Sequence, residues 1–339
     1  MKAWEIRNGE LALHDVRPAQ PRENETVVRV SHTGICGSDL PKLSRPDSFA
    51  LPGFWRPGHE VVGLDPANRP VAVDPLAPCG NCTRCTTGDI HLCADLRRLG
   101  WDIPGGFAEE VVVPAENAHP LSSGVNPLHA VLADPAAVAI HGLRCNPIAP
   151  PGRLAIVGAG TVGLLTALYA RQQGWTVTIV HRDGRPPPDA LAKTVRAAFR
   201  SPATLPQDQT FDTVVDAAAG NDPTPLDLAL RLVGDGGTVV VQNAYHPGVQ
   251  LSTSLRDLFR RSIRLIGSFS YCRRRSDDFS LALDLLRHHA AQIAHLVVPA
   301  GELAELPTVL GTQRTRSLRH VLTVHASERP RQVGWRSTG

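Results

Sequence analysis

Four of the seven cysteines in this 339-residue chain lie close together, in the spacing Cys79-x2-Cys82-x2-Cys85-x7-Cys93. Four thiolates on one short loop can close a tetrahedral shell around zinc and leave no position for a substrate. We therefore expect a structural zinc site in residues 79–93. An iron–sulfur cluster or a nucleic-acid-binding zinc ribbon would use similar ligands. His91 lies inside the loop, where we expect a surface residue and not a ligand.

A second group of potential metal ligands comes earlier in the chain. Cys36 stands in the segment Gly34-Ile35-Cys36-Gly37-Ser38-Asp39, and His59 and Glu60 follow Pro57-Gly58. A thiolate and an imidazole are two of the three protein ligands that catalytic zinc keeps beside one open position. A single cysteine and a single histidine are more often core residues, so this hypothesis depends on the other motifs of the chain.

A glycine-rich turn, Gly158-Ala159-Gly160-Thr161-Val162-Gly163, fits the pattern G-x-G-x-x-G. It stands between an apolar strand at 153–157 and a helical stretch at 162–173, the context that dinucleotide binding requires. Gly158 allows the tight turn, Gly160 lets the backbone approach a pyrophosphate, and Gly163 lets helix and strand pack closely. The free N–H groups at the start of the helix, with Thr161 and Val162, would face the phosphates.

The next strand of this unit, at 176–180, is followed by His181-Arg182-Asp183. An acidic residue at such a strand end usually bonds the ribose diol of NAD. If His181 takes that place, Arg182 can pair with a 2′-phosphate, which favours NADP. If the register slips by two residues, Asp183 is the acid and NAD is favoured. Arg182 would then be an ordinary loop arginine.

The elements that must position these residues are of two kinds. Short β-branched runs at 27–31, 60–63, 70–73 and 108–113, separated by Pro and Gly, predict a β-sandwich or barrel. After 147–152, apolar strands at 153–157, 176–180, 211–216 and 237–241 alternate with helices, including one at 226–232. This alternation predicts a doubly wound parallel sheet. An amphipathic helix is expected over 279–288 and a strand over 318–324, whereas 185–209 carries no clear pattern.

Length and composition narrow the class of protein. A chain of 339 residues with 42% hydrophobic and 20% charged residues is ordinary globular protein of about two domains. No apolar run reaches the ~18–20 residues of a membrane span and no signal-peptide pattern is present, so we expect a cytoplasmic protein. A net charge of +3 is too small for a nucleic-acid-binding surface. Clustered cysteines without a secretion signal favour metal ligands over disulfides.

Together these motifs resemble those of the medium-chain, zinc-dependent alcohol/polyol dehydrogenases. The likeness extends to Gly105-Gly106-Phe107-Ala108-Glu109, Gly267-Ser268-Phe269 and Leu318-Arg319-His320-Val321-Leu322, and it covers about residues 1–325. It implies a GroES-like, β-rich catalytic domain, residues 1–135 and 288–339, with an inserted Rossmann domain, residues 136–287. The active site would lie in the cleft between these domains.

The resemblance implies a catalytic zinc held by Cys36, His59 and a third ligand. Alcohol dehydrogenases have a cysteine there and polyol dehydrogenases a glutamate, whereas this chain has Asp134. Aspartate is one methylene shorter and could bind zinc directly or through water, and Glu60 could serve as an exchangeable ligand instead. As an alternative, Asp134 caps the helix that starts before Pro135. With either carboxylate as a ligand, the zinc site would resemble that of the polyol dehydrogenases more than that of the alcohol dehydrogenases.

The resemblance also implies roles in the reaction. Zinc would lower the pKa of a bound substrate hydroxyl, Ser38 would accept its proton, and hydride would pass to the nicotinamide. A family histidine that continues the proton relay is replaced by Pro41. Arg319 would reach the cofactor pyrophosphate, with a surface charge at a strand edge as its alternative.

Other residues are expected to be structural. His141 would pack within its helix, and Arg273-Arg274-Arg275 would form a solvated loop. Phe49, Trp55 and Trp101 could shape the substrate pocket.

We therefore predict a zinc-dependent oxidoreductase that transfers hydride between NAD(P) and a secondary alcohol, with a polyol or cyclitol as the preferred class. Two zinc ions per chain are expected, and NADP is favoured over NAD. The alternatives are an aldehyde or ketone reductase of the same superfamily and a non-catalytic dinucleotide-binding protein. A homodimer or homotetramer is expected, with a small-molecule substrate and with neither nucleic acid nor membrane as a partner.

Overall fold

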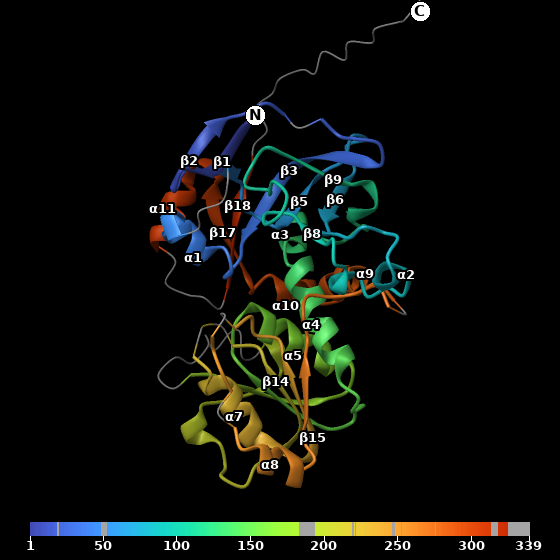
Figure 1. The fold of residues 1–339 in the computed structure, drawn as a ribbon, viewed down its shortest axis with the longest axis vertical. Coiled ribbons are helices and arrows are strands. Elements are labelled where there is room, and N and C mark those ends of the chain that lie inside the picture. The colour runs from blue at the N-terminus through green and yellow to red at the C-terminus, as the bar shows by residue number, and fades with distance from the viewer. Residues whose placement is uncertain are drawn as a thin grey trace, which may run out of the picture.

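The computed structural model describes residues 1–18, 20–48, 53–182, 194–218, 220, 222–245, 248–251, 253–274, 276–312 and 318–324. Within these residues the chain forms a β-rich part and a part built on a parallel sheet, drawn above and below in Figure 1. This architecture confirms the β-rich and parallel-sheet halves expected from the sequence. Among the helices of these ranges, none is long and apolar enough to cross a membrane.

The β-rich part contains a three-stranded sheet and a seven-stranded sheet. In the larger one β3 (Glu25–Ile35) pairs antiparallel with β5 (Glu60–Leu64), β9 (Glu110–Pro114) and β18 (Arg319–Thr323). A strand from the end of the described chain therefore lies beside one from its beginning. The other strands of this part are β1 (Lys2–Arg7), β2 (Glu10–Asp15), β4 (Phe54–Trp55), β6 (Pro70–Val73), β7 (Leu76–Ala77), β8 (Arg97–Arg98), β10 (Ala118–Pro120) and β17 (Val297–Glu302).

The second part is a parallel sheet in the order β13-β12-β11-β14-β15-β16. The chain enters in the middle and winds outward in both directions, which is the strand order of dinucleotide-binding folds. Helices cover the sheet, and its central strands at 153–157 and 176–180 are apolar runs buried along nearly their whole length. The strands are β11 (Arg153–Val157), β12 (Thr176–Val180), β13 (Ala198–Arg200), β14 (Phe211–Asp216), β15 (Val233–Val241) and β16 (Arg264–Gly267).

Two helices lie between the two parts in Figure 1, α4 (Ala133–Cys145) and α9 (Asp278–His288). They share one core cluster that includes Ile140 and Phe279, and this cluster continues under the parallel sheet to Ile156. The chain passes out to the parallel sheet after α4 and returns before α9. The other helices are α1 (Leu40–Ser44), α2 (Thr83–Thr86), α3 (Pro127–Ala130), α5 (Thr161–Gln172), α7 (Thr224–Leu232), α8 (Leu255–Arg260), α10 (Ala290–Ile293) and α11 (Leu306–Thr312).

Candidate catalytic metal site and cofactor-binding turn

Neighbouring strands bring the predicted ligands of the catalytic site together. Cys36 directly follows β3, His59 directly precedes β5, and the register of these strands pairs Gly34 with Glu60. The ligand atoms of Cys36, His59 and Glu60 all lie within 4.8 Å of one another. Gly34 leaves room for the carboxylate, because a Cβ at this position would collide with Oε2 of Glu60.

Asp39 positions both the cysteine and the histidine, a role that sequence reasoning missed. Its Oδ1 lies 3.5 Å from Nδ1 of His59, and its Oδ2 accepts a hydrogen bond from the backbone N–H of Cys36 at 3.1 Å. Neither Oδ1 of Asp39 nor Nδ1 of His59 has a hydrogen-bond partner among the described residues, so this contact is electrostatic; a buried carboxylate behind a histidine raises the basicity of the ring. The available signal was a carboxylate three residues after Cys36, within the motif already singled out.

Asp134 lies in the first turn of α4, close to the other nitrogen of the same histidine. Its Oδ2 is 3.9 Å from Nε2 of His59. The N-cap of α4 is Leu132, so the alternative role of Asp134 as the helix cap is wrong. Burial raises the pKa of Asp134 to about 6, although the charge of His59 opposes this rise.

Arg319 lies inside the site and not at a solvated strand edge. Its Nε is 2.9 Å from Oε2 of Glu60, and the two side chains are 6% and 0% exposed. Its Nη1 donates to the carbonyl of Ile35 at 2.8 Å. The Nε–Oε2 contact lacks hydrogen-bond geometry, so neither oxygen of Glu60 has a hydrogen-bond partner among the described residues. The surface-charge alternative is therefore wrong, and the contact with a pyrophosphate stays a prediction.

The charges around this cluster suit a cation. Burial alone would raise the pKa of the Cys36 thiol, but the charges of Arg319 and His59 outweigh it and lower the pKa to about 5. Burial opposes protonation of His59, yet Asp39 and Cys36 raise its pKa well above the usual value. The thiolate is the form that binds zinc. A divalent cation could take the place of the imidazole proton among these acidic groups.

Trp101 and Lys42 border the site. The ring of Trp101 lies 6.4 Å from that of His59, and the ammonium of Lys42 lies 2.7 Å from the Trp101 ring centroid. Burial lowers the pKa of Lys42 to about 8, against the effect of Asp39. Lys42 belongs to no motif, and sequence reasoning missed it. Trp55 is buried and donates its indole N–H to Gly100 at 2.8 Å, whereas Phe49 lies outside the described residues.

Ser38 lies on the exposed turn between Cys36 and Asp39. A hydrogen bond of 3.0 Å from the N–H of Asp39 to the carbonyl of Cys36 closes this turn. The hydroxyl is therefore at the solvent-facing edge of the cluster, where a proton could leave the site. Its role as proton acceptor stays a prediction.

The glycine-rich turn has the backbone geometry of a phosphate cradle. Gly158 has a φ of +118°, and a Cβ there would lie 2.7 Å from the carbonyl oxygen of Ala217. A Cβ on Gly163 would collide with the carbonyl oxygen of Gly158. Gly160, the N-cap of α5, differs, because a Cβ there would meet no atom within 4 Å. The open space before the start of α5, where Thr161 and Val162 follow, fits a phosphate group.

The end of β12 leaves Arg182 accessible. The N–H of His181 donates to the carbonyl of Arg200 at 2.9 Å, which extends the pairing with β13. Arg182 is exposed. Hydrogen bonds from Thr224 and the charge of Arg182 lower the pKa of Asp222. Asp183, the residue that would favour NAD, lies outside the described residues.

The four cysteines of residues 79–93, the four-cysteine lobe, converge as their spacing predicts. Their sulfurs all lie within 4.8 Å of one another, with 3.5 Å between Cys82 and Cys85 and 3.8 Å between Cys79 and Cys85. Four thiolates at about 2.3 Å from a tetrahedral zinc ion are ~3.8 Å apart. This donor set fits a closed zinc site.

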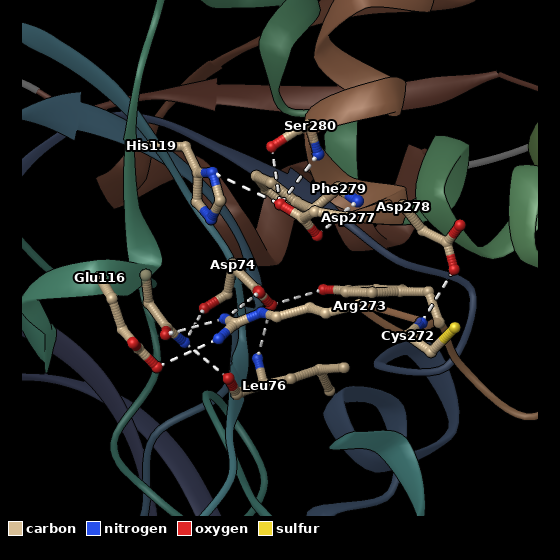
Figure 2. Close-up of polar contacts among 12 residues, drawn as sticks. Asp74, Leu76, Glu116, His119, Cys272, Arg273, Asp277, Asp278, Phe279 and Ser280 are labelled. Atoms are coloured by element: carbon tan, nitrogen blue, oxygen red, sulfur yellow. Dashed lines mark hydrogen bonds and ion pairs between the residues drawn. The ribbon is translucent and has the colours of Figure 1, made fainter. Parts of the chain in front are cut away.

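Arg273 is not part of a solvated loop, which corrects the expectation for this residue, whereas Arg274 is exposed as expected. Figure 2 shows Arg273 reaching into the β-rich part, where its Nη2 lies 3.0 Å from the fully buried carboxylate of Asp74. Its Nη1 donates to Glu116 at 3.1 Å. Arg274 forms an ion pair with Asp89 of the four-cysteine lobe. Arg275 lies outside the described residues.

His141 is buried, as expected of a packing residue, whereas His91 is less exposed than expected. His91 is half-buried and not on the surface, and its ring meets that of His141 edge-on with the centroids 4.9 Å apart. His141 makes a polar contact beyond its helix, since its Nδ1 lies 3.0 Å from Oδ2 of Asp278. A sequence pattern could not bring these residues together, because they lie far apart in the chain.

Comparison with known proteins agrees with this geometry. Residues 22–123 match the alcohol dehydrogenase GroES-like domain. The chain is 32% identical to the D-altritol 5-dehydrogenase of Agrobacterium fabrum over 320 residues, which are 89% of this chain and 92% of that protein. It is 29% identical to the L-galactonate-5-dehydrogenase of Escherichia coli over 271 residues, 73% of this chain and 76% of that one.

A solved structure supports the same assignment over nearly the whole chain. A zinc-binding dehydrogenase of Sinorhizobium meliloti, bound to NADP, superposes with a TM-score of 0.83 at 27% identity and covers 95% of this chain and 98% of that one. The strand order, the ligand cluster and the glycine turn are thus found in a chain that aligns with such enzymes from end to end. This protein belongs to the zinc-dependent medium-chain alcohol/polyol dehydrogenases, a family of oxidoreductases that use NAD(P).

Proposed function

We propose that this enzyme interconverts a secondary alcohol and a ketone on an open-chain polyol, a cyclitol or a sugar acid. The observation that carries the proposal is the convergence of Cys36, His59 and Glu60 within 4.8 Å, with Asp134 beside the same histidine. Carboxylate ligands make the zinc site harder than a second cysteine would. The names of two similar proteins, D-altritol 5-dehydrogenase and L-galactonate-5-dehydrogenase, support a polyhydroxylated substrate.

Asp134 is the third zinc ligand in this proposal, and Glu60 remains with Arg319. If Glu60 turned to the metal, the guanidinium of Arg319 would lose its buried counter-charge. An unpaired buried charge is costly. Asp134 is not the counter-charge of a buried arginine, because its ionic neighbour is His59, 3.9 Å away. Asp134 would complete the ligand set with Cys36 and His59.

The remaining residues bind, orient and exchange a proton. Zinc, when bound, would stabilise the ionised form of the substrate hydroxyl, and NAD(P) would take up or return the hydride. Asp39 holds the ring of His59 and the backbone of Cys36 in place. Ser38 accepts the hydroxyl proton and, from its exposed turn, passes it to solvent. Water must carry the proton onward, because Pro41 has no group that could do so.

NADP is the cofactor we propose, on the evidence of Arg182. The pyrophosphate would lie at Gly160 and the start of α5, and Arg319 would reach it from β18. Arg182 is exposed at the end of β12, where the ribose of such a cofactor lies. Its planar fork is suited to a 2′-phosphate. The NADP held by the similar Sinorhizobium meliloti protein supports this choice.

A second zinc ion in the four-cysteine lobe, two domains and self-association complete the proposal. We propose domain limits of 1–135 with 288–339 and of 136–287; they are supported by the parallel sheet, whose strands all lie between Arg153 and Gly267. The chain would form a homodimer or homotetramer. Phe259 on α8 is 83% exposed and Leu265 on the edge strand β16 is 42% exposed, a surface that a second copy could cover. Light scattering would give the number of chains.

Activity assays on the purified full-length enzyme test the function. Polyols, cyclitols and sugar acids would be offered with NAD or NADP, and aldehydes with the reduced cofactors. We expect ketone formation from a secondary alcohol, abolished in Cys36→Ser together with the loss of one zinc per chain. Turnover of aldehydes alone would assign the enzyme to the reductases. Cys36→Ser with an unchanged zinc content and unchanged activity would refute the site.

A further inference from the structure

A third group of potential metal ligands lies outside both zinc sites. Ligand atoms of His91, His141 and Cys272 all lie within 4.8 Å of one another. His91 belongs to a single 3-10 turn at Ile90–Leu92 in the four-cysteine lobe, His141 to α4, and Cys272 to the segment between β16 and α9. The cluster therefore joins three segments that are far apart in the chain. It lies where the four-cysteine lobe meets α4 and the segment between β16 and α9.

His141 has the orientation that a metal ligand needs. Its Nδ1 lies 3.0 Å from Oδ2 of Asp278, which is fully buried. The same carboxylate oxygen accepts the backbone N–H of Cys272 at 2.9 Å, as Figure 2 shows. Because Nδ1 is engaged with Asp278, Nε2 is the nitrogen that faces the thiols, and it forms a hydrogen bond of 3.5 Å with the sulfur of Cys145 that a shared ion could replace. A buried carboxylate behind a histidine is the usual support of a metal ligand.

His91 supplies a second imidazole and an unsatisfied nitrogen. Its ring meets that of His141 edge-on, with the centroids 4.9 Å apart. Its Nδ1 is buried and has no hydrogen-bond partner among the residues that the structure describes. A buried polar atom without a partner is uncommon and costs free energy. A bound ion is one of the few explanations that also accounts for the neighbouring thiols.

The charges nearby leave room for a cation. Among the described residues near this cluster, Arg144 and Arg274 each already have a carboxylate partner, Asp278 for Arg144 and Asp89 for Arg274. Two thiolates, from Cys272 and Cys145, would neutralise a divalent ion, and a buried site favours neutrality. Cys145 and His91 are only half-buried, so an ion could reach the cluster from solvent.

We propose that His91, His141, Cys272 and Cys145 form a third metal site and that it holds zinc. Imidazole and thiolate donors select zinc or copper over magnesium and calcium. Four such donors leave no open position, as in structural zinc sites. The ion would fasten the four-cysteine lobe to α4 and to the segment that returns from the parallel sheet. The ion pairs of Arg273 and Arg274 join the same pieces.

Zinc content tests the site independently of activity. Full-length protein would be saturated with Zn²⁺, dialysed against metal-free buffer and subjected to elemental analysis. We expect His91→Gln and Cys272→Ser each to lose one zinc per chain relative to the parent protein, and His288→Gln, an exposed histidine on α9, to lose none. Cys36→Ser combined with His91→Gln would lose two. This additivity separates the third site from the catalytic one.

Two outcomes of the zinc analysis would overturn the third site. One is an unchanged zinc content in both His91→Gln and Cys272→Ser. The other is the loss of two ions in either single variant, because the four-cysteine lobe would then have failed as a whole. Alkylation followed by mass spectrometry gives a second measurement. Zinc should protect Cys145 and Cys272 from iodoacetamide in the parent protein but not in His91→Gln; a Cys145–Cys272 disulfide in zinc-saturated protein would also refute the site.

Discussion

Arg319 and Glu60 form a buried ion pair at the centre of the catalytic cluster. Their atoms Nε and Oε2 are 2.9 Å apart, and each side chain is nearly inaccessible to solvent. The pairing of β18 with β3 brings the arginine there, because His320 is registered against Ile35, the residue before Cys36. The guanidinium would therefore compete with a metal for the carboxylate of Glu60, which supports the proposal of Asp134 as the third ligand.

This arrangement predicts opposite effects for two conservative substitutions. Asp134→Asn should lose most of the catalytic zinc while its thermal unfolding midpoint stays close to that of the parent. Glu60→Gln should retain the zinc but lose stability by about 3–5 kcal/mol, because it leaves Arg319 buried without a counter-charge. Elemental analysis and thermal unfolding of both variants check the pattern. The reverse pattern would make Glu60 the ligand.

Ser38→Ala should reduce turnover by about 10²–10⁴-fold, the usual contribution of general acid–base catalysis. The hydroxyl is exposed on the turn after Cys36, so its removal should not disturb packing. Ser44→Ala is the matched control, since Ser44 is an exposed serine on the adjacent helix α1. The assay needs a deuterated alcohol to show that chemistry limits the rate. Normal turnover of Ser38→Ala with a full isotope effect would exclude the proton-accepting role.

Arg182→Ala should raise the KM for NADP far more than the KM for NAD. A 2′-phosphate would lose a charge-assisted pair, whereas the ribose diol of NAD makes no such contact. The exposed Arg231, on α7, provides a control in Arg231→Ala. Steady-state kinetics with NAD and with NADP measure the two KM values. An equal change for NAD and NADP would mean that Arg182 does not read the phosphate.

Substitutions of Arg273 and Arg274, in the segment between β16 and α9, should differ sharply in their effect on stability. Arg273→Ala removes the partner of Asp74, whose side chain is 0% exposed, and should cost about 3 kcal/mol or more. Arg274 is 58% exposed in its pair with Asp89, so solvent screens this pair and Arg274→Ala should cost much less stability than Arg273→Ala. Thermal unfolding of the two variants measures the difference. Equally small losses of stability in the two variants would show that Asp74 is stabilised mainly by its hydrogen bonds with Tyr271 and Leu76.

Features carried by contiguous residues could be predicted from the sequence. The four-cysteine lobe and the turn from Gly158 to Gly163 each lie within one short segment, so their spacing alone indicates their geometry. Apolar runs likewise predict the strands of the parallel sheet, because β11 and β12 are buried along nearly their whole length. β13, within the unpatterned segment 185–209, was not expected; it has only three residues, none of them fully buried.

Pairings across the fold could not be predicted in this way. Arg319 reaches Glu60, Arg273 reaches Asp74, and His91 meets His141 only because β18, the returning segment and the lobe converge in space. Glu60 and Arg319 lie in motifs recognised from the sequence, but no local pattern indicates that they pair. Arg273 and His91 were expected to be exposed to solvent. Asp39 also stood within a recognised motif, but its contact with His59 was missed because the two residues are not neighbours in the chain.

The glycine turn allows a test that separates cofactor binding from folding. Gly160→Ala places its Cβ in open space at a φ of −82°, which any residue adopts, so the variant should unfold at the temperature of the parent. Its methyl group would enter the space proposed for the phosphate and push the phosphate away from the backbone N–H groups. The loss of one hydrogen bond to the phosphate should weaken NADP binding about tenfold.

Gly163→Ala should behave differently, because its Cβ would collide with the carbonyl oxygen of Gly158. The start of α5 must then move away from β11, which should cost about 1–3 kcal/mol of stability as well as affinity. Calorimetric titration with NADP and thermal unfolding would be carried out on both variants. If Gly160→Ala bound NADP as tightly as the parent while Gly163→Ala lost stability, the turn would be a packing device only, and the pyrophosphate would have to bind elsewhere.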